Sequence, residues 1–158
     1  MTTLRCRTPA WRVVLVAALL LAGAREALSQ QATGASVPRD TSAAAVVRGY
    51  VQAYNAHDID AVLSFLAPEF VWLNVAGDSL TVEARGPAVV RTQLTGYFRQ
   101  LPSARSELEE LTVLGPWVSA KERAHWASAA GPRSQAALSV YEVRGGLIRR
   151  VWYYPSVR

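Results

Sequence analysis

The chain has 158 residues, of which 51% are hydrophobic, and a formal net charge of +5. That length allows one domain with a real core and little more. The arginines beyond the first segment are scattered rather than clustered, which argues against a nucleic-acid-binding face.

The first 29 residues have the pattern of a secretory signal. Three arginines among the first twelve residues precede an apolar run at 13–24, which is too short for a bilayer that needs roughly 20 apolar residues. Ala27 and Ser29 predict cleavage before Gln30. Cleavage after Ala24, an uncleaved anchor and a misassigned start remain alternatives. We expect an exported protein, periplasmic or secreted.

Removal of this signal changes the charge and the thiol content. It takes away four arginines and one glutamate, a net +3, and leaves +2. The single cysteine, Cys6, also lies in the signal. The mature chain therefore has no disulfide, and a hydrophobic core must hold it together.

Residues 30–40 are small and polar and predict a flexible leader, and the domain is expected over 41–156. Apolar residues then recur at three- and four-residue spacing through Tyr54, which predicts a helix capped within Asp40 to Ser42. Asp58 is placed to cap a second short helix, and Pro68 is expected to end it.

Strand patterns dominate the rest of the chain. "FVWLN" and "SLTVEA" flank Gly77-Asp78 and predict a hairpin. Gly86-Pro87 opens a third helix that Pro102 closes. Four strands then follow from Glu107 onward, separated by Gly-Pro and Gly-Gly turns. This order predicts an α+β fold with helices on one face of a curved antiparallel sheet.

The sequence resembles a known superfamily through three phrases: "YVQAYNAHDIDAVLSFLAPEFVW", the "G-P-x-x-V" opening of the third helix, and "YEVRGGLIRRVWYY". They are similar to the nuclear transport factor 2-like superfamily, in its SnoaL-like and ketosteroid-isomerase-like branch, over roughly Thr41 to Pro155. The resemblance implies a cone-shaped sheet wrapped around a pocket that three helices of the N-terminal half close. Such folds host enzymes, binding proteins and assembly modules alike.

Ketosteroid isomerase uses an aspartate base, with a tyrosine and a neutral aspartic acid that hold the oxyanion. The resemblance places the tyrosine at Tyr50, the base at Asn74 and the second acid near Ser139. An asparagine has no proton to exchange at neutral pH. Steroid isomerisation by the usual mechanism is therefore not expected.

The expected ligand-binding residues are largely aromatic. Trp72 and Asn74 are two apart on a strand and share one side, which suits a flat, mostly apolar ligand. Tyr50 and Tyr54 are one helical turn apart and share a face. Alternatively, the three aromatic residues are core side chains and Asn74 hydrogen-bonds to the turn before Gly77. The predicted ligand-binding set is Tyr54, Trp72, Asn74, Ser139 and Tyr141.

His125 is the only histidine on a predicted strand, and with Tyr50 it forms the predicted catalytic set. The register implied by the resemblance turns Arg123, His125 and Ala127 toward the pocket and Trp126 outward. A slip of one residue reverses every side chain. An inward His125 is an acid-base candidate, whereas an outward one is a surface or interface residue.

The remaining polar residues favour structural roles. Asp58 and Asp60 fit a helix cap, and the three glutamates of 107–110 fit a solvated strand face. Two isolated histidines and no mature cysteine give no metal site, and no glycine-rich phosphate loop precedes a helix. We expect neither metal nor cofactor.

The last strand, "VWYYP", is apolar on both faces. With Leu138 and Val140 on the outer side of its neighbour, it predicts a homodimer through the outer sheet face. Two functions remain open. One is an exported protein that binds a small, largely apolar molecule, with catalysis undecided between none and a cofactor-independent isomerase, cyclase or hydrolase that uses His125. The other is a non-catalytic dimerisation or interaction module.

Overall fold

The computed structural model describes residues 41–154. The expected signal (1–29), the leader (30–40) and the last expected domain residues (155–156) lie outside this range. The described elements are α1 (Ala43–Asn55), α2 (Ile59–Leu63), β1 (Leu66–Ala76), β2 (Ser79–Arg85), α3 (Gly86–Gln100), β3 (Arg105–Leu114), β4 (Trp117–Ser128), β5 (Gly131–Arg144) and β6 (Leu147–Tyr153).

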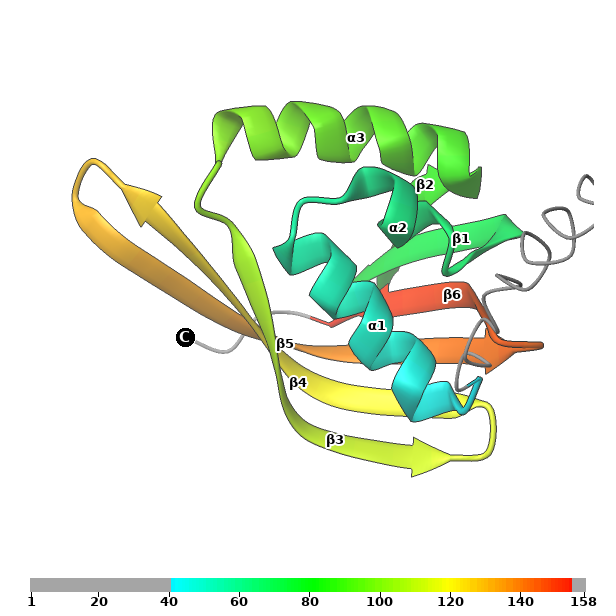
Figure 1. Ribbon diagram of the computed structural model, residues 1–158. Coiled ribbons are helices and arrows are strands. Elements are labelled where there is room, and N and C mark those ends of the chain that lie inside the picture. Colours follow the sequence, from blue (N-terminus) through cyan, green and yellow to red (C-terminus); the bar gives the residue numbers. More distant parts are fainter. Residues whose placement is uncertain (1–40, 155–158) are drawn as a thin grey trace, which may run out of the picture. The chain divides into compact units, whose positions relative to one another are not determined.

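The strands form one six-stranded sheet in the order β2-β1-β6-β5-β4-β3. Every neighbouring pair is antiparallel except β1 and β6, which are parallel. The sheet is curved and open, and the three helices lie on one side of it (Figure 1). The expected α+β architecture, with helices on the inner side of a curved sheet, is confirmed.

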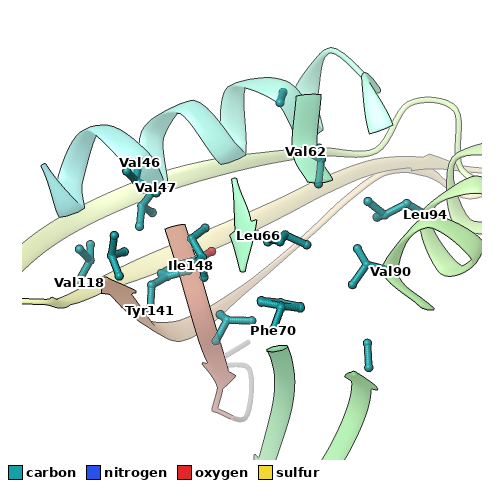
Figure 2. Close-up of a cluster of buried hydrophobic side chains, with 14 of the residues drawn as sticks. Val46, Val47, Val62, Leu66, Phe70, Val90, Leu94, Val118, Tyr141 and Ile148 are labelled. Atoms are coloured by element: carbon teal, nitrogen blue, oxygen red, sulfur yellow. The ribbon is translucent and has the colours of Figure 1, made fainter. Parts of the chain in front are cut away.

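Helix α1 begins at the expected cap and buries one face. The Oγ of Ser42 accepts a hydrogen bond from the backbone N–H of Ala45 at 3.3 Å. Val46, Val47 and Val51 are buried, and Figure 2 shows Val46 and Val47 pointing from the helix toward the sheet. Burial of each valine contributes about 1.5–3 kcal/mol, so this face fixes α1 on the sheet.

Helix α2 is shorter than expected. Asp58 caps it, accepting from the N–H of Ala61 at 2.9 Å, but the helix ends at Leu63. Pro68 lies inside β1 instead, so the expectation that it ends the helix is wrong. The strand tolerates proline there because the pairing with β6 is irregular between Leu66 and Val71, where the missing N–H is not needed.

Helix α3 opens with Gly86 and Pro87, as expected. Gly86 has φ of 74°, a left-handed conformation that favours glycine, and Pro87 occupies the first turn. Val90, Leu94 and Phe98 are buried.

The core lies between the helices and the inner face of the sheet. Figure 2 shows Phe70, Tyr141 and Ile148 from the strands gathered opposite α1, together with Val118 of β4. Each of these four side chains is at most 2% exposed. In the part of the chain that the structure describes, no helix is long and apolar enough to cross a membrane.

Candidate functional site

A cavity of about 350 Å³ lies between α1, α3 and the inner face of the sheet. Its volume is in the range of small-molecule pockets. Its lining residues come from every helix and strand except α2 and β5: Tyr50, Val51, Tyr54, Trp72, Glu83, Gln93, Leu94, Tyr97, Ser106, Glu122, Ala124, Val151 and Tyr153.

Five aromatic rings line the cavity. Tyr50 and Tyr54 come from successive turns of α1, as their spacing predicts. The ring centroids of Tyr54 and Tyr97 are 6.5 Å apart, and those of Trp72 and Tyr153 are 5.8 Å apart. The structure therefore brings Tyr50, Tyr54 and Trp72 together at one hollow with two aromatic residues that the sequence interpretation did not assign to it.

Asn74 supports this wall rather than lining the cavity. Its side chain lies on the same side of β1 as Trp72, and its Oδ1 accepts a hydrogen bond from Trp72 Nε1 at 3.2 Å. This bond satisfies the indole N–H and orients the ring. Asn74 therefore contacts the site through Trp72.

Ser139 and Tyr141 are fully buried on the inner side of β5 and are also not among the lining residues. The Oγ of Ser139 donates to the backbone oxygen of Ala120 at 3.3 Å. The hydroxyl of Tyr141 donates to the carboxylate of Glu122 at 2.6 Å. Tyr141 is therefore joined to the cavity through Glu122, whereas Ser139 only ties β5 to β4.

The expected register of β4 is wrong by one residue. Glu122 and Ala124 line the cavity, and Trp126 lines a second hollow next to it. His125 pairs on the opposite side of the sheet with Glu107, Nε2 to Oε2 at 3.4 Å, and its side chain is 44% exposed. Its predicted partner Tyr50 lies in the cavity, so the structure does not bring the predicted catalytic pair together.

The outer side of β3 and β4 is a ladder of charges. Arg123 Nε donates to Glu109 at 2.7 Å, and Lys121 Nζ lies 2.9 Å from the same carboxylate. These two cations lower the pKa of Glu109 to about 2. Glu110, at φ 49°, lies at a bulge where β3 carries one residue more than β4. The glutamates of this segment are thus paired across the sheet rather than only solvated.

Glu122 is the polar centre of the cavity, and the sequence interpretation missed it. Its Oε1 accepts a hydrogen bond from Ser106 Oγ at 2.5 Å. Its Oε2 has two hydroxyls in reach, Tyr141 at 2.6 Å and Tyr153 at 3.1 Å. The oxygens of Tyr141 and Tyr153 are themselves 3.1 Å apart. Three neutral donors from three strands therefore surround one carboxylate.

A residue outside the cavity positions this network. Asn55, at the end of α1, donates from Nδ2 to the backbone oxygen of Ser106 at 2.8 Å. The backbone N–H of Ser106 donates back to Asn55 Oδ1 at 2.7 Å. This two-way bond fixes the start of β3 on α1, so it also fixes the Ser106 hydroxyl that reaches Glu122.

Burial and the nearby carboxylate raise the pKa of the phenols in and beside the cavity. For Tyr50, Tyr141 and Tyr153, burial is the larger cause of the raised pKa and the charge of Glu122 the next. The pKa of Tyr54 is raised by burial and then by its hydrogen bond with Tyr97. These hydroxyls remain protonated near neutral pH and act as hydrogen-bond donors.

A second hollow of about 290 Å³ continues from the first. It extends along the inner side of the long β4–β5 hairpin, which projects beyond the helices in Figure 1. Four residues line both hollows: Tyr97, Glu122, Ala124 and Tyr153. Glu122 therefore stands where the two hollows meet.

Among residues 41–154, no group of three or more histidine, cysteine, aspartate or glutamate side chains is placed to hold a metal ion. The polar side chains of the site are the carboxylate of Glu122, a second carboxylate and an amide at the exposed rim (Glu83 and Gln93), the hydroxyl of Ser106 and several phenols. Such groups accept or donate hydrogen bonds and hold a charge.

Comparison with protein families gives one match. The model of the SnoaL-like domain family matches residues 47–151. This range contains every lining residue of both hollows except Tyr153. A sequence comparison with curated proteins finds no match.

Solved structures show the same fold at low sequence identity. Wild-type IdmH from Streptomyces antibioticus, described as a candidate polyketide cyclase, has a TM-score of 0.61 and 19% identity, covering 72% of this chain and 91% of its own. A cystatin-fold protein from Novosphingobium aromaticivorans has a TM-score of 0.60 and 23% identity, covering 74% and 98%. A candidate polyketide cyclase from Xanthomonas campestris has a TM-score of 0.54 and 24% identity, covering 74% and 91%.

Proposed function

Because this chain belongs to the SnoaL-like domain family, we propose that it binds a small, flat and largely apolar molecule in the cavity on the inner face of its sheet. The observation that carries the proposal is the wall of five aromatic rings around a single half-buried carboxylate. Aromatic walls with few polar groups are typical of sites for flat organic ligands.

The similar structures support a small organic ligand of this class. Two of them are described as candidate polyketide cyclases. Because their sequence identity to this chain is below 25%, these structures establish only the shared fold. The class of ligand is inferred from the residues that line the cavity of this chain.

Catalysis is not part of this proposal. Asn74 occupies the position where the resemblance implies the base, and His125 faces away from the cavity. The carboxylate of Glu122 has hydroxyl groups within hydrogen-bond distance of both oxygens. These contacts suit the anchoring of a ligand group.

We test binding by calorimetry with two flat probes, 2-naphthalenemethanol and 2-naphthylmethylamine. Ala124→Phe places a ring inside the hollow, so it is expected to weaken the binding of both probes at least tenfold. Ala127→Phe is the matched control, because Ala127 is exposed on the same strand and outside both linings. If neither probe binds the folded wild-type chain, or if both variants behave alike, the proposal is wrong.

We also propose that the chain is a homodimer through its outer sheet face. Leu138 is 47% exposed and Trp117 is 38% exposed there. The ring of Trp117 packs against Trp152 at 5.8 Å, and Trp152 pairs with Val140. An apolar patch of this kind on an open sheet favours a subunit contact.

Export remains a proposal that rests on the sequence of residues 1–29. N-terminal sequencing of the protein recovered from outside the cytoplasm is expected to begin at Gln30. Recovery of the chain with Met1 intact in the cytoplasm of its own host would contradict it.

A further inference from the structure

The lining of the cavity carries negative charge without positive charge. Glu122 lies inside and Glu83 lies at the exposed rim beside Gln93, whose Nε2 donates to the Glu83 backbone oxygen at 2.8 Å. No lysine, arginine or histidine is among the lining residues of either hollow. The ion pairs found among residues 41–154 do not include Glu122.

The hydrogen bonds to Glu122 do not balance its charge. Ser106, Tyr141 and Tyr153 are neutral donors. A carboxylate in a partly desolvated, aromatic environment is stabilised by a cation far more than by further neutral donors. The charged groups of the outer sheet face, such as Arg123, are occupied by their own partners.

One acceptor position of Glu122 is available to a ligand. A carboxylate accepts about four hydrogen bonds. Oε2 has two hydroxyls in reach, whereas Oε1 has only Ser106. Because Glu122 lines both hollows, a ligand that fills either one reaches this carboxylate.

The aromatic wall adds a second attraction for positive charge. The faces of tyrosine and tryptophan rings attract ammonium groups within about 6 Å, which is worth about 0.5–2 kcal/mol. Tyr50, Tyr153 and Trp72 supply such rings around the hollow that Glu122 faces. Burial and the charge of Glu122 raise the pKa of Tyr50, so its hydroxyl stays protonated and neutral at neutral pH.

From this combination we infer that the ligand of the cavity is an organic cation: an amine with a flat apolar body, whose ammonium N–H donates to Glu122 Oε1. The inference rests on the proposed function and adds the charge class of the ligand. The same arrangement disfavours carboxylates and phosphates, because Glu122 and Glu83 repel them.

The test compares three probes of one shape and three charges on the full wild-type chain at neutral pH. They are 2-naphthylmethylamine, which is a cation, 2-naphthalenemethanol, which is a neutral donor, and 2-naphthoate, which is an anion. By calorimetry, the amine is expected to bind at least tenfold more tightly than the alcohol, about 1.4 kcal/mol, and the naphthoate to show no binding.

A matched pair of variants assigns the preference to Glu122. Glu122→Gln keeps the shape and removes the charge, so the ratio of amine to alcohol affinity is expected to fall about tenfold. Glu107→Gln makes the same change on the outer face and leaves the ratio unchanged. Should Glu122→Gln fail to fold, Glu83→Gln at the exposed rim gives a second measurement, with an expected two- to threefold fall in the ratio.

The outcomes separate the two proposals. Equal binding of amine and alcohol to the wild-type chain overturns the charge inference and leaves the binding cavity intact. A ratio unchanged in a folded Glu122→Gln variant also overturns it. Failure of all three probes to bind overturns both.

Discussion

Glu122 is the residue on which the polar chemistry of the cavity depends. It is half-buried, and its carboxylate is held by hydroxyls from β3, β5 and β6. Tyr141 makes the shorter of the two contacts to Oε2, at 2.6 Å, from a fully buried position. A hydrogen bond to a charged group contributes more to stability than one between neutral groups.

We therefore expect Tyr141→Phe to lower the free energy of unfolding by about 1.5–3 kcal/mol, because the ring stays and only the donor is lost. Tyr154→Phe removes the same hydroxyl from a 38% exposed ring and is expected to change stability by less than about 0.5 kcal/mol. Urea unfolding of both variants measures the difference. Equal stabilities would mean that the Tyr141 bond does not contribute to stability.

The raised pKa values of Tyr50, Tyr54, Tyr141 and Tyr153 predict a loss of stability in alkali. Above about pH 10 the unfolded chain releases phenolic protons that the folded chain retains. The contribution is complete below that pH and is lost as pH rises, by up to about 1.4 kcal/mol per pH unit for each fully buried tyrosine. Urea midpoints should therefore fall from pH 8 to pH 11.

Tyrosinate absorbance gives an independent check of this alkaline prediction. At pH 11 the folded chain is expected to absorb less than the urea-unfolded chain, because its buried phenols are still protonated. Full tyrosinate absorbance at that pH, with the far-ultraviolet circular dichroism of the native protein retained, would contradict it.

At the scale of the elements, close helix packing appears at Gly49. A Cβ built there would lie 2.6 Å from Phe65 Cζ, so α1 passes close to the ring that precedes β1. A Cβ at Gly96 in α3 would meet no atom within 4 Å. Both glycines lie inside a helix, but a side chain at Gly49 would collide with Phe65 whereas one at Gly96 would meet open space.

Gly96→Ala is expected to stabilise the protein by about 0.5–1 kcal/mol, since alanine is the better helix residue. Gly49→Ala is expected to lack this gain or to destabilise, because the Phe65 ring must shift. Thermal unfolding of both variants provides the comparison. Equal stabilisation by both would show that α1 does not need the close approach.

Much of the fold was predictable from local pattern. The caps at Ser42 and Asp58 and the Gly86-Pro87 helix start depend on residues close in sequence, and each lies where the sequence predicts it. The turns at Gly77, Gly115 and Gly145 do so too, whereas Gly131-Pro132 begins β5 and the turn before it lies at residues 129–130. The position of Pro68 was not predictable, because its tolerance depends on irregular pairing with β6, a strand distant in sequence.

The orientation of β4 shows why the site was harder to predict from the sequence than the fold. The family register placed His125 inside, whereas the strand's own alternation indicates the opposite. The odd-numbered positions carry the charged or polar side chains of Lys121, Arg123 and His125. The even-numbered positions are apolar at Val118, Ala120, Ala124 and Trp126. Glu122 is the one acid in the apolar series, and this break in the pattern was the signal for it. Its partner hydroxyls come from distant strands, so no local pattern predicts them.

For the whole molecule, the outer sheet face decides the expected assembly. Light scattering of the wild-type chain at micromolar concentration is expected to give twice the mass of one chain. Leu138→Asp, which places a charge on this face, is expected to give monomers. Val89→Asp makes the same kind of change at a similarly exposed position on α3 and should leave the dimer intact. A wild-type monomer, or a dimer in both variants, would contradict the proposed interface.

The most direct test of the central claim is to locate a bound ligand by the indole N–H signals of the tryptophans in a ¹H–¹⁵N NMR spectrum. The probe is whichever of 2-naphthylmethylamine and 2-naphthalenemethanol binds more tightly. Trp72 lines the cavity, whereas Trp117 and Trp152 pack together on the outer face. We predict that the Trp72 signal shifts on addition of the probe, while those of Trp117 and Trp152 do not. An unmoved Trp72 signal at a saturating probe concentration, or shifts confined to the outer pair, would contradict a ligand-binding cavity on the inner face.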